Sequence, residues 1–571
     1  MSGHSRRNVL RATALTGAAT ALGTTGPAST AEAASTAAPS GGRGCPPPPD
    51  PVRVGPDDPR YAHLTSRGAS NRFRGAPDSV HLVSTTGQAV RAVREAVRAG
   101  GRVAVRSGGH CFEDFVDHPE VRTVIDLSGM ADVYFDPARH AFVVEAGATL
   151  GEAFRRLYLG WGVTVPGGYC PEVGAGGHVA GGGYGPLCRL FGLISDHLYA
   201  VEVVVVDRAG QVRSVVASRE PSDPHRDLWW AHTGGGGGSF GLVTRYWFRS
   251  PGTTAATAPE RLLPAPPASA LTFRAEWAWE GLDRPAFTRL VANHGRWAVR
   301  HSAPDSEQSA LYSEFVLLRQ SAGFLLMVGQ VAAGPGAGER LLDEHIGAIS
   351  AGGPRPARLT KQRLPWLTAA LRGTGDEVGD WRLKIKSGYL RRPFTDRQIA
   401  KIHHHLTRTD SDVVSGSLSL NTYGGQVNTV APGSTAVAQR DAIIKLSYLT
   451  VWEHPHQDAA HLAWIRAFYR DMYADTGGVP VPGPVHDGAF INYPDTDLAD
   501  PAWNTSGVPW HALYFKGDYA RLQAVKERWD PRDVFRHALS VRPAGSPGTL
   551  GSPGTPGTPG ALKIPTGPSG S

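Results

Sequence analysis

The hydrophobic positions between residues 80 and 248 alternate between short apolar runs and stretches with a helical period. One helix is predicted after Thr86, which can cap it, and a second after the capping box of Thr149 and Glu152. Strands are predicted over residues 81–83, 102–106, 124–127, 142–145 and 201–206. The last run is apolar almost throughout, which is typical of a strand buried on both faces. The pattern over residues 80–248 therefore predicts an α+β unit with a helix-covered sheet.

The pattern loosens after residue 251, and the proline-rich stretch 264–267 indicates a boundary. Further strands are predicted over residues 313–318, 324–331 and 443–451, and helices over residues 285–299 and 458–473. We therefore expect a second domain with a mainly antiparallel sheet and flanking helices. The remainder, residues 477–541, is loop-rich until Asp518, where a helix through Trp529 begins.

The two ends of the chain have biased compositions. Arg6 and Arg7 precede a weakly apolar stretch and the small residues at 31–33, an order that predicts a Tat-like export signal and a secreted protein. A Gly/Pro-rich linker follows, and repeats rich in Ser, Pro, Gly and Thr form a low-complexity tail.

Composition excludes several classes of protein. The 571 residues carry a net charge of +7 that is spread along the chain, so no nucleic-acid partner is expected. No run of 18 uncharged apolar residues occurs, so no membrane association is expected once the signal is removed. Four cysteines are too few for a disulfide scaffold of this size. The triple histidine 403–405 predicts a solvated helix face, and no metal site is expected.

Three glycine clusters are the least ordinary feature of the chain. The first is the loop 106–110, which contains paired glycines and ends at His110; the third is the loop 234–238. Between them, residues 167–185 contain nine glycines, which rules out a stable helix or strand on propensity alone. Such a backbone can lie against an extended dinucleotide. The clusters lack the spacing of a Rossmann fingerprint and of a P-loop.

These clusters, in this order, resemble the FAD-binding domain of the vanillyl-alcohol oxidase and p-cresol methylhydroxylase type. Within that type, the chain is similar to the berberine bridge enzyme-like oxidoreductases over roughly residues 77–541. The motifs around His110 and Cys170 resemble the branch with doubly attached flavin. The resemblance implies FAD as the cofactor, bonded through its 8α-methyl carbon to His110 and through ring carbon C6 to Cys170.

The resemblance also implies a division of the chain. The expected parts are a signal (1–34), a linker (35–75), an FAD-binding domain of p-cresol methylhydroxylase type (76–252), a substrate-binding domain (253–476), a segment that returns to the flavin (477–541) and the tail (542–571). The fold class is α+β. The residues expected to bind the cofactor are Arg106, Ser107, Gly108, Gly109, His110, Gly168, Cys170, Gly174, Gly177, His178, Gly182, Tyr184, Gly185, Gly241, Val243, Asn492 and Tyr493.

The side chains of His110 and Cys170 are chemically suited to the implied attachment to the flavin. An imidazole nitrogen and a thiolate are good nucleophiles toward an electron-poor isoalloxazine ring. Two attachments would also raise the reduction potential of the flavin and favour hydride acceptance from an alcohol. A buried inert cysteine is the ordinary alternative for Cys170, but its flanking glycines argue against a packed core.

Two tyrosines are candidates for the catalytic base. Tyr493 lies in the motif 491–495 and Tyr423 in the motif 421–428, and both motifs resemble family motifs. The resemblance makes Tyr493 the general base, while Tyr423 would position substrate or act in a second step. A packing role is the alternative for each.

An unperturbed tyrosine has a pKa of about 10, so a nearby cation or hydrogen-bond donor must favour the phenolate. Lys384, Lys386, Arg391 and Arg392 are candidates, and the sequence does not choose among them.

The resemblance implies an FAD-dependent oxidase that acts on an alcohol or hemiacetal hydroxyl of a sugar or glycosylated natural product. Dioxygen would be the acceptor and hydrogen peroxide the product, in a monomer or homodimer. A dehydrogenase with another acceptor, an oxidative ring-closing enzyme and a non-enzymatic flavin or ligand binder remain alternatives.

Overall fold

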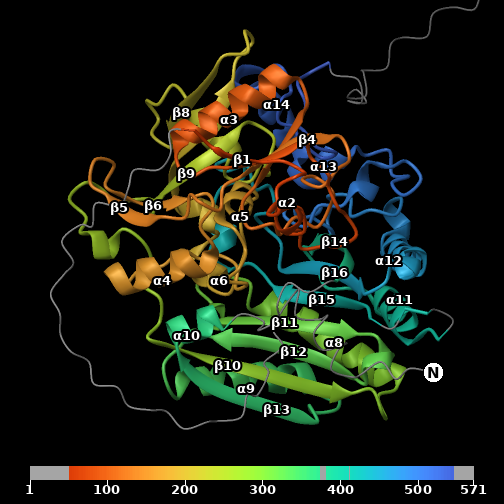
Figure 1. The fold of residues 1–571 in the computed structure, drawn as a ribbon. Coiled ribbons are helices and arrows are strands. Elements are labelled where there is room, and N and C mark those ends of the chain that lie inside the picture. Colours follow the sequence, from red (N-terminus) through yellow and green to blue (C-terminus); the bar gives the residue numbers. More distant parts are fainter. Residues whose placement is uncertain (1–49, 373–380, 410–411, 414, 546–571) are drawn as a thin grey trace, which may run out of the picture.

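The computed structural model describes residues 50–372, 381–409, 412–413 and 415–545, which form three β-sheets with flanking helices (Figure 1). The predicted export signal and most of the tail lie outside the described residues. The linker prediction fails from residue 50 onward, since β1 (Val52–Val54) and α2 (Tyr61–Thr65) are formed there. None of the described helices is long and apolar enough to cross a membrane.

The first sheet has the order β1-β2-β4-β3. Strands β2 (Ser79–Leu82), β4 (Val121–Asp126) and β3 (Arg102–Arg106) are parallel, and β1 pairs antiparallel with β2. Helix α3 (Thr86–Ala99) connects β2 to β3. Its N-cap is Thr85, one residue before the predicted cap, because the Thr85 hydroxyl accepts from the Gln88 amide. The β3 strand ends at the first glycine cluster.

The second sheet is antiparallel, with the order β5-β6-β9-β7-β8. Its strands are β5 (Val133–Asp136), β6 (Ala141–Glu145), β9 (Leu242–Phe248), β7 (Leu198–Val206) and β8 (Val212–Ser218). The β7 strand is buried along nearly its whole length, as its apolar run predicts. The short helices α6 (Cys188–Phe191) and α7 (Arg226–Ala231) accompany α4 (Leu150–Trp161), which begins at the predicted capping box. A third short helix, α5 (Ala175–Ala180), lies inside the glycine-rich segment 167–185, so the expectation that this segment forms no helix is wrong there.

The third sheet is a seven-stranded antiparallel sheet with the order β13-β10-β12-β11-β15-β16-β14. Its strands are β13 (Arg358–Pro365), β10 (Ser269–Ala278), β12 (Phe324–Val331), β11 (Leu311–Leu318), β15 (Ser417–Thr422), β16 (Ile444–Trp452) and β14 (Arg382–Leu390). Helices α8 (Arg284–Arg300), α9 (Ala337–Ser350), α11 (Asp396–Thr407) and α12 (Asp458–Met472) accompany it, and α10 (Trp366–Leu371) contacts α4. The predicted antiparallel sheet with flanking helices is present.

The expectation of a solvated histidine face on α11 is wrong for one residue. His405 is buried and stacks on Phe468 with ring centroids 4.8 Å apart.

The last described segment leaves α12 and runs back to the first two sheets (Figure 1). It contains α13 (Trp510–Phe515) and α14 (Tyr519–Trp529), and α14 packs against α7. Beyond α14, Phe535 forms an isolated bridge with Val103 of β3. The C-terminal segment therefore reaches the strand that leads into the first glycine cluster.

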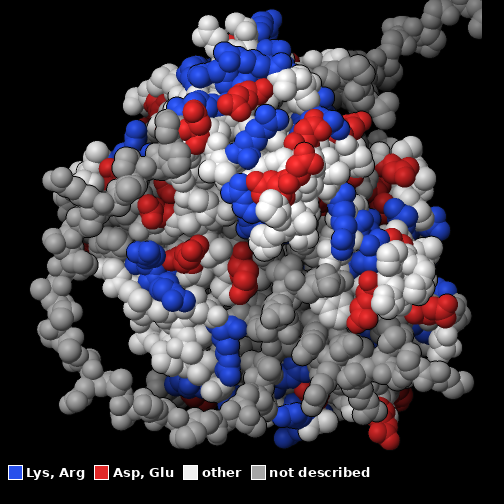
Figure 2. All heavy atoms as spheres, viewed as in Figure 1, with Lys and Arg blue, Asp and Glu red and all other residues white. Residues whose placement is uncertain are grey.

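The charges on the outer surface are of both signs. Figure 2 shows Lys and Arg side chains interspersed with Asp and Glu on the face in view.

Candidate active site

One cavity of about 330 Å³ collects the segments that the glycine clusters single out. Its walls are the end of β3 with the following loop, the loop and helix from 168 to 180, the loop 235–243, the segment 490–494 and the segment 535–539. The volume is in the range of small-molecule and cofactor sites. Segments far apart in the chain thus form one chamber.

The first glycine loop and the start of α5 meet backbone to backbone. A Cβ atom on Gly108 would lie 2.3 Å from the Gly174 nitrogen, and one on Gly174 would lie 2.1 Å from the Ser107 hydroxyl. The Ser107 hydroxyl donates to the Ala146 carbonyl at 2.6 Å, which fixes the loop on the second sheet. Only glycine permits this approach, and it leaves exposed backbone along the cavity wall.

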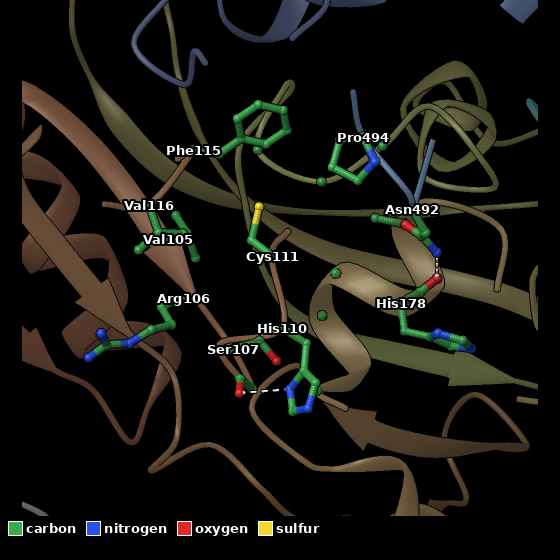
Figure 3. Close-up of a pocket in the computed structure, with 18 of the residues that line it drawn as sticks. Val105, Arg106, Ser107, His110, Cys111, Phe115, Val116, His178, Asn492 and Pro494 are labelled. Atoms are coloured by element: carbon green, nitrogen blue, oxygen red, sulfur yellow. Dashed lines mark hydrogen bonds between the residues drawn. The ribbon is translucent and has the colours of Figure 1, made fainter. Parts of the chain in front are cut away.

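Arg106 lines the cavity, but its guanidinium donates hydrogen bonds to protein oxygens. Its guanidinium donates to Asp126 at 2.8 Å and to the Leu64 carbonyl at 2.5 Å, and the side chain points away from His110 (Figure 3). Nε and Nη1 of Arg106 are thus paired within the protein, while its Nη2 is buried without a hydrogen-bond partner among the described residues. The glycine loops offer main-chain N–H groups to an anion in the cavity.

His110 lines the cavity, and its Nδ1 lies 3.1 Å from the Gly108 carbonyl oxygen (Figure 3). Burial lowers the pKa of His110 below its usual value. The imidazole is therefore neutral at physiological pH and keeps one nitrogen lone pair.

Cys170 lines the same cavity as His110. Its thiol donates to Oε2 of Glu172 at 3.3 Å. Burial, followed by the Glu172 charge, raises the pKa of Cys170 to about 12. The sulfur is accessible to a ligand in the cavity but protonated at neutral pH.

His178 joins the cavity walls to one another. Its Nε2 accepts from the Gly168 amide at 3.0 Å, and its carbonyl accepts from the Asn492 side-chain amide at 3.0 Å (Figure 3). Burial lowers the pKa of His178 to about 4, so the ring stays neutral and can accept. These contacts of His178 order the loop and tie it to the segment around Asn492.

Tyr493 lines the cavity, and its ring contacts two aromatic side chains and one cation. Phe112 and Phe490 meet its ring edge-on, at centroid distances of 5.8 and 5.3 Å. Nζ of Lys445 lies 4.2 Å from the Tyr493 ring centroid and 5.2 Å from that of Tyr184. Burial, followed by the charge of Glu314, raises the pKa of Tyr493 above its ordinary value.

Lys445 and Glu314 belong to one row of side chains across the third sheet. Glu314 of β11 pairs with Asn421 of β15, which pairs with Lys445 of β16, which pairs with Tyr389 of β14. Burial raises the pKa of Glu314 and lowers that of Lys445, while each charge opposes this effect in the other. The cation beside the predicted base is therefore Lys445, which the sequence did not single out.

The lysines proposed from the sequence serve another purpose. Lys384 contacts Glu113 and lies 2.8 Å from Asp495, while Lys386 lies 2.7 Å from Asp495. Burial alone would lower the pKa of Lys384, but Asp495 and Glu113 outweigh it and raise the pKa. Asp497 completes the network through Lys386 at 2.6 Å and Arg466 at 2.7 Å.

Of the two arginines proposed from the sequence, one is paired with carboxylates and the other is exposed. Arg391 pairs with Asp441 at 2.9 Å and with Asp487 at 2.7 Å, and Arg392 is exposed. The expectation that one of the four sequence-predicted cations faces Tyr493 is therefore wrong.

Most of the predicted cofactor residues line the cavity. They are Arg106, Ser107, Gly108, Gly109, His110, Gly168, Cys170, Gly174, Gly177, His178, Tyr184, Gly241, Val243, Asn492 and Tyr493. Gly182 and Gly185 lie outside the lining, where they allow close packing: a Cβ on Gly185 would lie 1.8 Å from the Gly167 carbonyl oxygen.

Tyr423 also lies outside the cavity lining. It is buried, its hydroxyl donates to the Gln439 carbonyl at 3.2 Å, and its ring packs on Tyr184 and Tyr389. Its role in the reaction stays a prediction.

The C-terminal wall was not predicted in detail. His537 stacks on Phe115 with centroids 3.9 Å apart, and its Nε2 lies 3.0 Å from the Gly237 carbonyl. Phe535 and Leu539 line the cavity beside it. No short motif marks these residues.

The donor set fits a flavin dinucleotide. The described residues contain no group of three His, Cys, Asp or Glu side chains placed to hold a metal. They do contain glycine backbone for an extended ligand and two nucleophiles, His110 and Cys170, on one cavity.

Family comparisons agree with this fit. A family model described as FAD binding domain matches residues 77–215, and one described as Berberine and berberine like matches residues 489–542. The aclacinomycin-N/aclacinomycin-A oxidase of Streptomyces galilaeus is 54% identical over 495 residues, which cover 86% of this chain and 90% of that protein. The chain belongs to the berberine bridge enzyme-like FAD-linked oxidases.

Two other members of this family extend the comparison. The hexose oxidase of Chondrus crispus is 32% identical, with 85% of this chain and 93% of that protein covered. The crystal structure of a glycopeptide hexose oxidase complexed with teicoplanin has a TM-score of 0.84 and 52% identity, and covers 87% of this chain and 100% of that one. The predicted family, α+β fold, FAD cofactor and oxidoreductase class are confirmed.

Proposed function

We propose that this FAD-linked oxidase oxidises an alcohol or hemiacetal hydroxyl of a sugar or glycosylated natural product, with dioxygen as acceptor and hydrogen peroxide as product. The observation that carries the proposal is the meeting of His110, Cys170 and Tyr493 on one glycine-lined cavity. The names of the relatives support the substrate class, since they include an aclacinomycin oxidase, a hexose oxidase and a glycopeptide hexose oxidase.

The proposal includes double attachment of FAD through His110 and Cys170. Both side chains line the cavity from separate loops, so two bonds would fix the ring from two sides. When bound, FAD supplies the acceptor for the hydride of the substrate.

Tyr493 is the proposed general base that takes the hydroxyl proton of the substrate. The raised pKa of Tyr493 favours the neutral phenol, so a positive charge is needed to favour the phenolate. Lys445 lies under the ring face, where its charge stabilises the anionic ring more than the neutral one. Tyr493 then accepts the proton at its hydroxyl oxygen.

We also infer export of the folded protein through the twin-arginine leader, since a signal of that kind carries proteins already loaded with cofactor. The proposed assembly is a monomer or a homodimer.

Double attachment predicts that flavin stays with the polypeptide after acid precipitation. His110→Ala and Cys170→Ala should each retain one linkage, and the double variant none, because each residue supplies one bond. Mass spectrometry of the proteolytic peptides with residues 110 and 170 measures this. Complete release of flavin from the wild type by acid would contradict the proposal.

Removal of the base should slow reduction of the flavin without altering its binding. Tyr493→Phe keeps the ring over Lys445 but removes the proton acceptor, so anaerobic reduction by substrate should slow by roughly a hundredfold or more. Stopped-flow absorbance measures the rate, and an unchanged flavin spectrum controls for binding. Wild-type reduction kinetics in this variant would exclude Tyr493 as the base.

If the charge of Lys445 favours the Tyr493 phenolate, replacement of Lys445 should shift the pH dependence of flavin reduction by substrate. Loss of the cation removes a charge–charge attraction that the phenolate has and the neutral phenol lacks, about 1–4 kcal/mol at this separation, so the rising limb should move up by about 1–3 pH units. We compare Lys445→Met with Lys445→Arg, which keeps a positive charge beside Glu314. Burial raises the pKa of Glu314, so this carboxyl can take up a proton where the cation is lost.

Lys361→Met, on the exposed strand β13, is the matched surface control for the Lys445 experiment. If the pH profiles of the two compared variants have the same rising limb, Lys445 does not stabilise the phenolate of Tyr493.

A dehydrogenase or an oxidative ring-closing enzyme is the alternative within the family. Under air, an oxidase should release one hydrogen peroxide for each hydroxyl oxidised when oligosaccharides or glycosylated compounds are supplied. A coupled peroxidase assay measures the release. Substrate oxidation that requires an added dye and yields no peroxide would favour the dehydrogenase.

A further inference from the structure

The loop that carries Cys170 holds a carboxylate against the thiol. The Cys170 sulfur donates to Oε2 of Glu172 at 3.3 Å, and both residues line the cavity. Neither the family comparison nor the proposed mechanism assigns a role to Glu172.

The thiol needs assistance to react. The thiolate is the nucleophilic form, and a pKa of about 12 leaves on the order of one thiol in 10⁵ ionised at pH 7. Main-chain amides of Glu172 and Val173 face the sulfur and favour the anion. These amides can stabilise negative charge on sulfur, but they cannot take its proton.

We propose that Glu172 removes the proton of Cys170 as the sulfur bonds to the flavin ring, an inference that rests on the double attachment proposed above. The S–H bond breaks as the S–C bond forms, and the thiol proton passes to the Glu172 carboxylate. The ring hydrogen at the bonded carbon leaves as a second proton, and two electrons stay on the cofactor. Dioxygen then accepts two electrons and two protons and forms hydrogen peroxide, which balances the step.

Other bases near the cavity are already engaged. His178 accepts from the Gly168 amide, Glu113 pairs with Lys384, and Glu314 accepts from the Tyr169 hydroxyl at 3.1 Å. Glu172 is exposed and sits two positions from the thiol. It can therefore exchange the proton with solvent after the bond has formed.

The loop is held so that this contact persists. The Pro171 carbonyl accepts from the Gly151 amide and the Val173 carbonyl from the Leu150 amide, each at 2.9 Å. Both donors belong to the first turn of α4, so the residues on either side of Glu172 are anchored. A fixed backbone keeps the carboxylate within reach of the sulfur.

The test compares Glu172→Gln with the wild type as purified flavoprotein. Gln keeps the size of the side chain and removes the proton acceptor, so attachment at Cys170 should slow by about a hundredfold or more at pH 7. Mass spectrometry measures the flavin-bearing fraction of the Cys170 peptide at harvest after brief expression and during later incubation. The His110 peptide of the same sample should stay fully modified, which controls for folding and flavin binding.

A change of pH separates a base from a structural residue. At pH 10 hydroxide can remove the thiol proton, so attachment in Glu172→Gln should recover toward the wild-type rate. Glu260→Gln, at an exposed carboxylate remote from the cavity lining, should match the wild type throughout.

Four outcomes would contradict either the role of Glu172 or the double attachment. Wild-type attachment at Cys170 in Glu172→Gln at pH 7, loss of flavin from both peptides, or loss that pH 10 does not restore would each overturn the role of Glu172. A wild-type Cys170 peptide without flavin would instead refute the double attachment itself.

Discussion

A buried network of ion pairs holds the two chemical centres of this molecule at a fixed distance. Glu113 follows His110 by three residues, Asp495 follows Tyr493 by two, and Lys384 of β14 joins the two carboxylates. These charges are almost completely inaccessible to water. Loss of one partner from such a group leaves an uncompensated buried charge, at a cost of about 3–5 kcal/mol. The attachment loop and the base loop are thus positioned from a single strand of the third sheet.

Much of the architecture could be predicted because its causes are local. The apolar run 324–331 coincides with β12, and the capping box at Thr149 begins α4. The glycine clusters were informative for a different reason: a backbone with nine glycines in nineteen residues needs an external partner. His110, Cys170 and Tyr493 were found through motifs of contiguous residues, and the structure brings all three to one cavity.

What the sequence did not predict depends on pairing between distant segments. Lys445 looks like an interruption of an apolar strand until its register with Asn421 and Glu314 is known. Strand β13 is exposed along most of its length and lacks the apolar pattern of a predicted strand. Strand β15 alternates serine with leucine over only four residues, too short a pattern to stand out in the sequence. Tyr423 was selected by its motif, but it follows the last residue of β15 and packs on Tyr389, outside the cavity lining.

The order of the cavity walls along the chain has a consequence for biogenesis. The loops of His110 and Cys170 leave the ribosome early, whereas the walls formed by segments 490–494 and 535–539 are among the last described residues to be synthesised. These walls are therefore missing until late in elongation, however early the first glycine loops fold. A chain truncated before His537 would lack the wall that stacks on Phe115 and meets the Gly237 carbonyl.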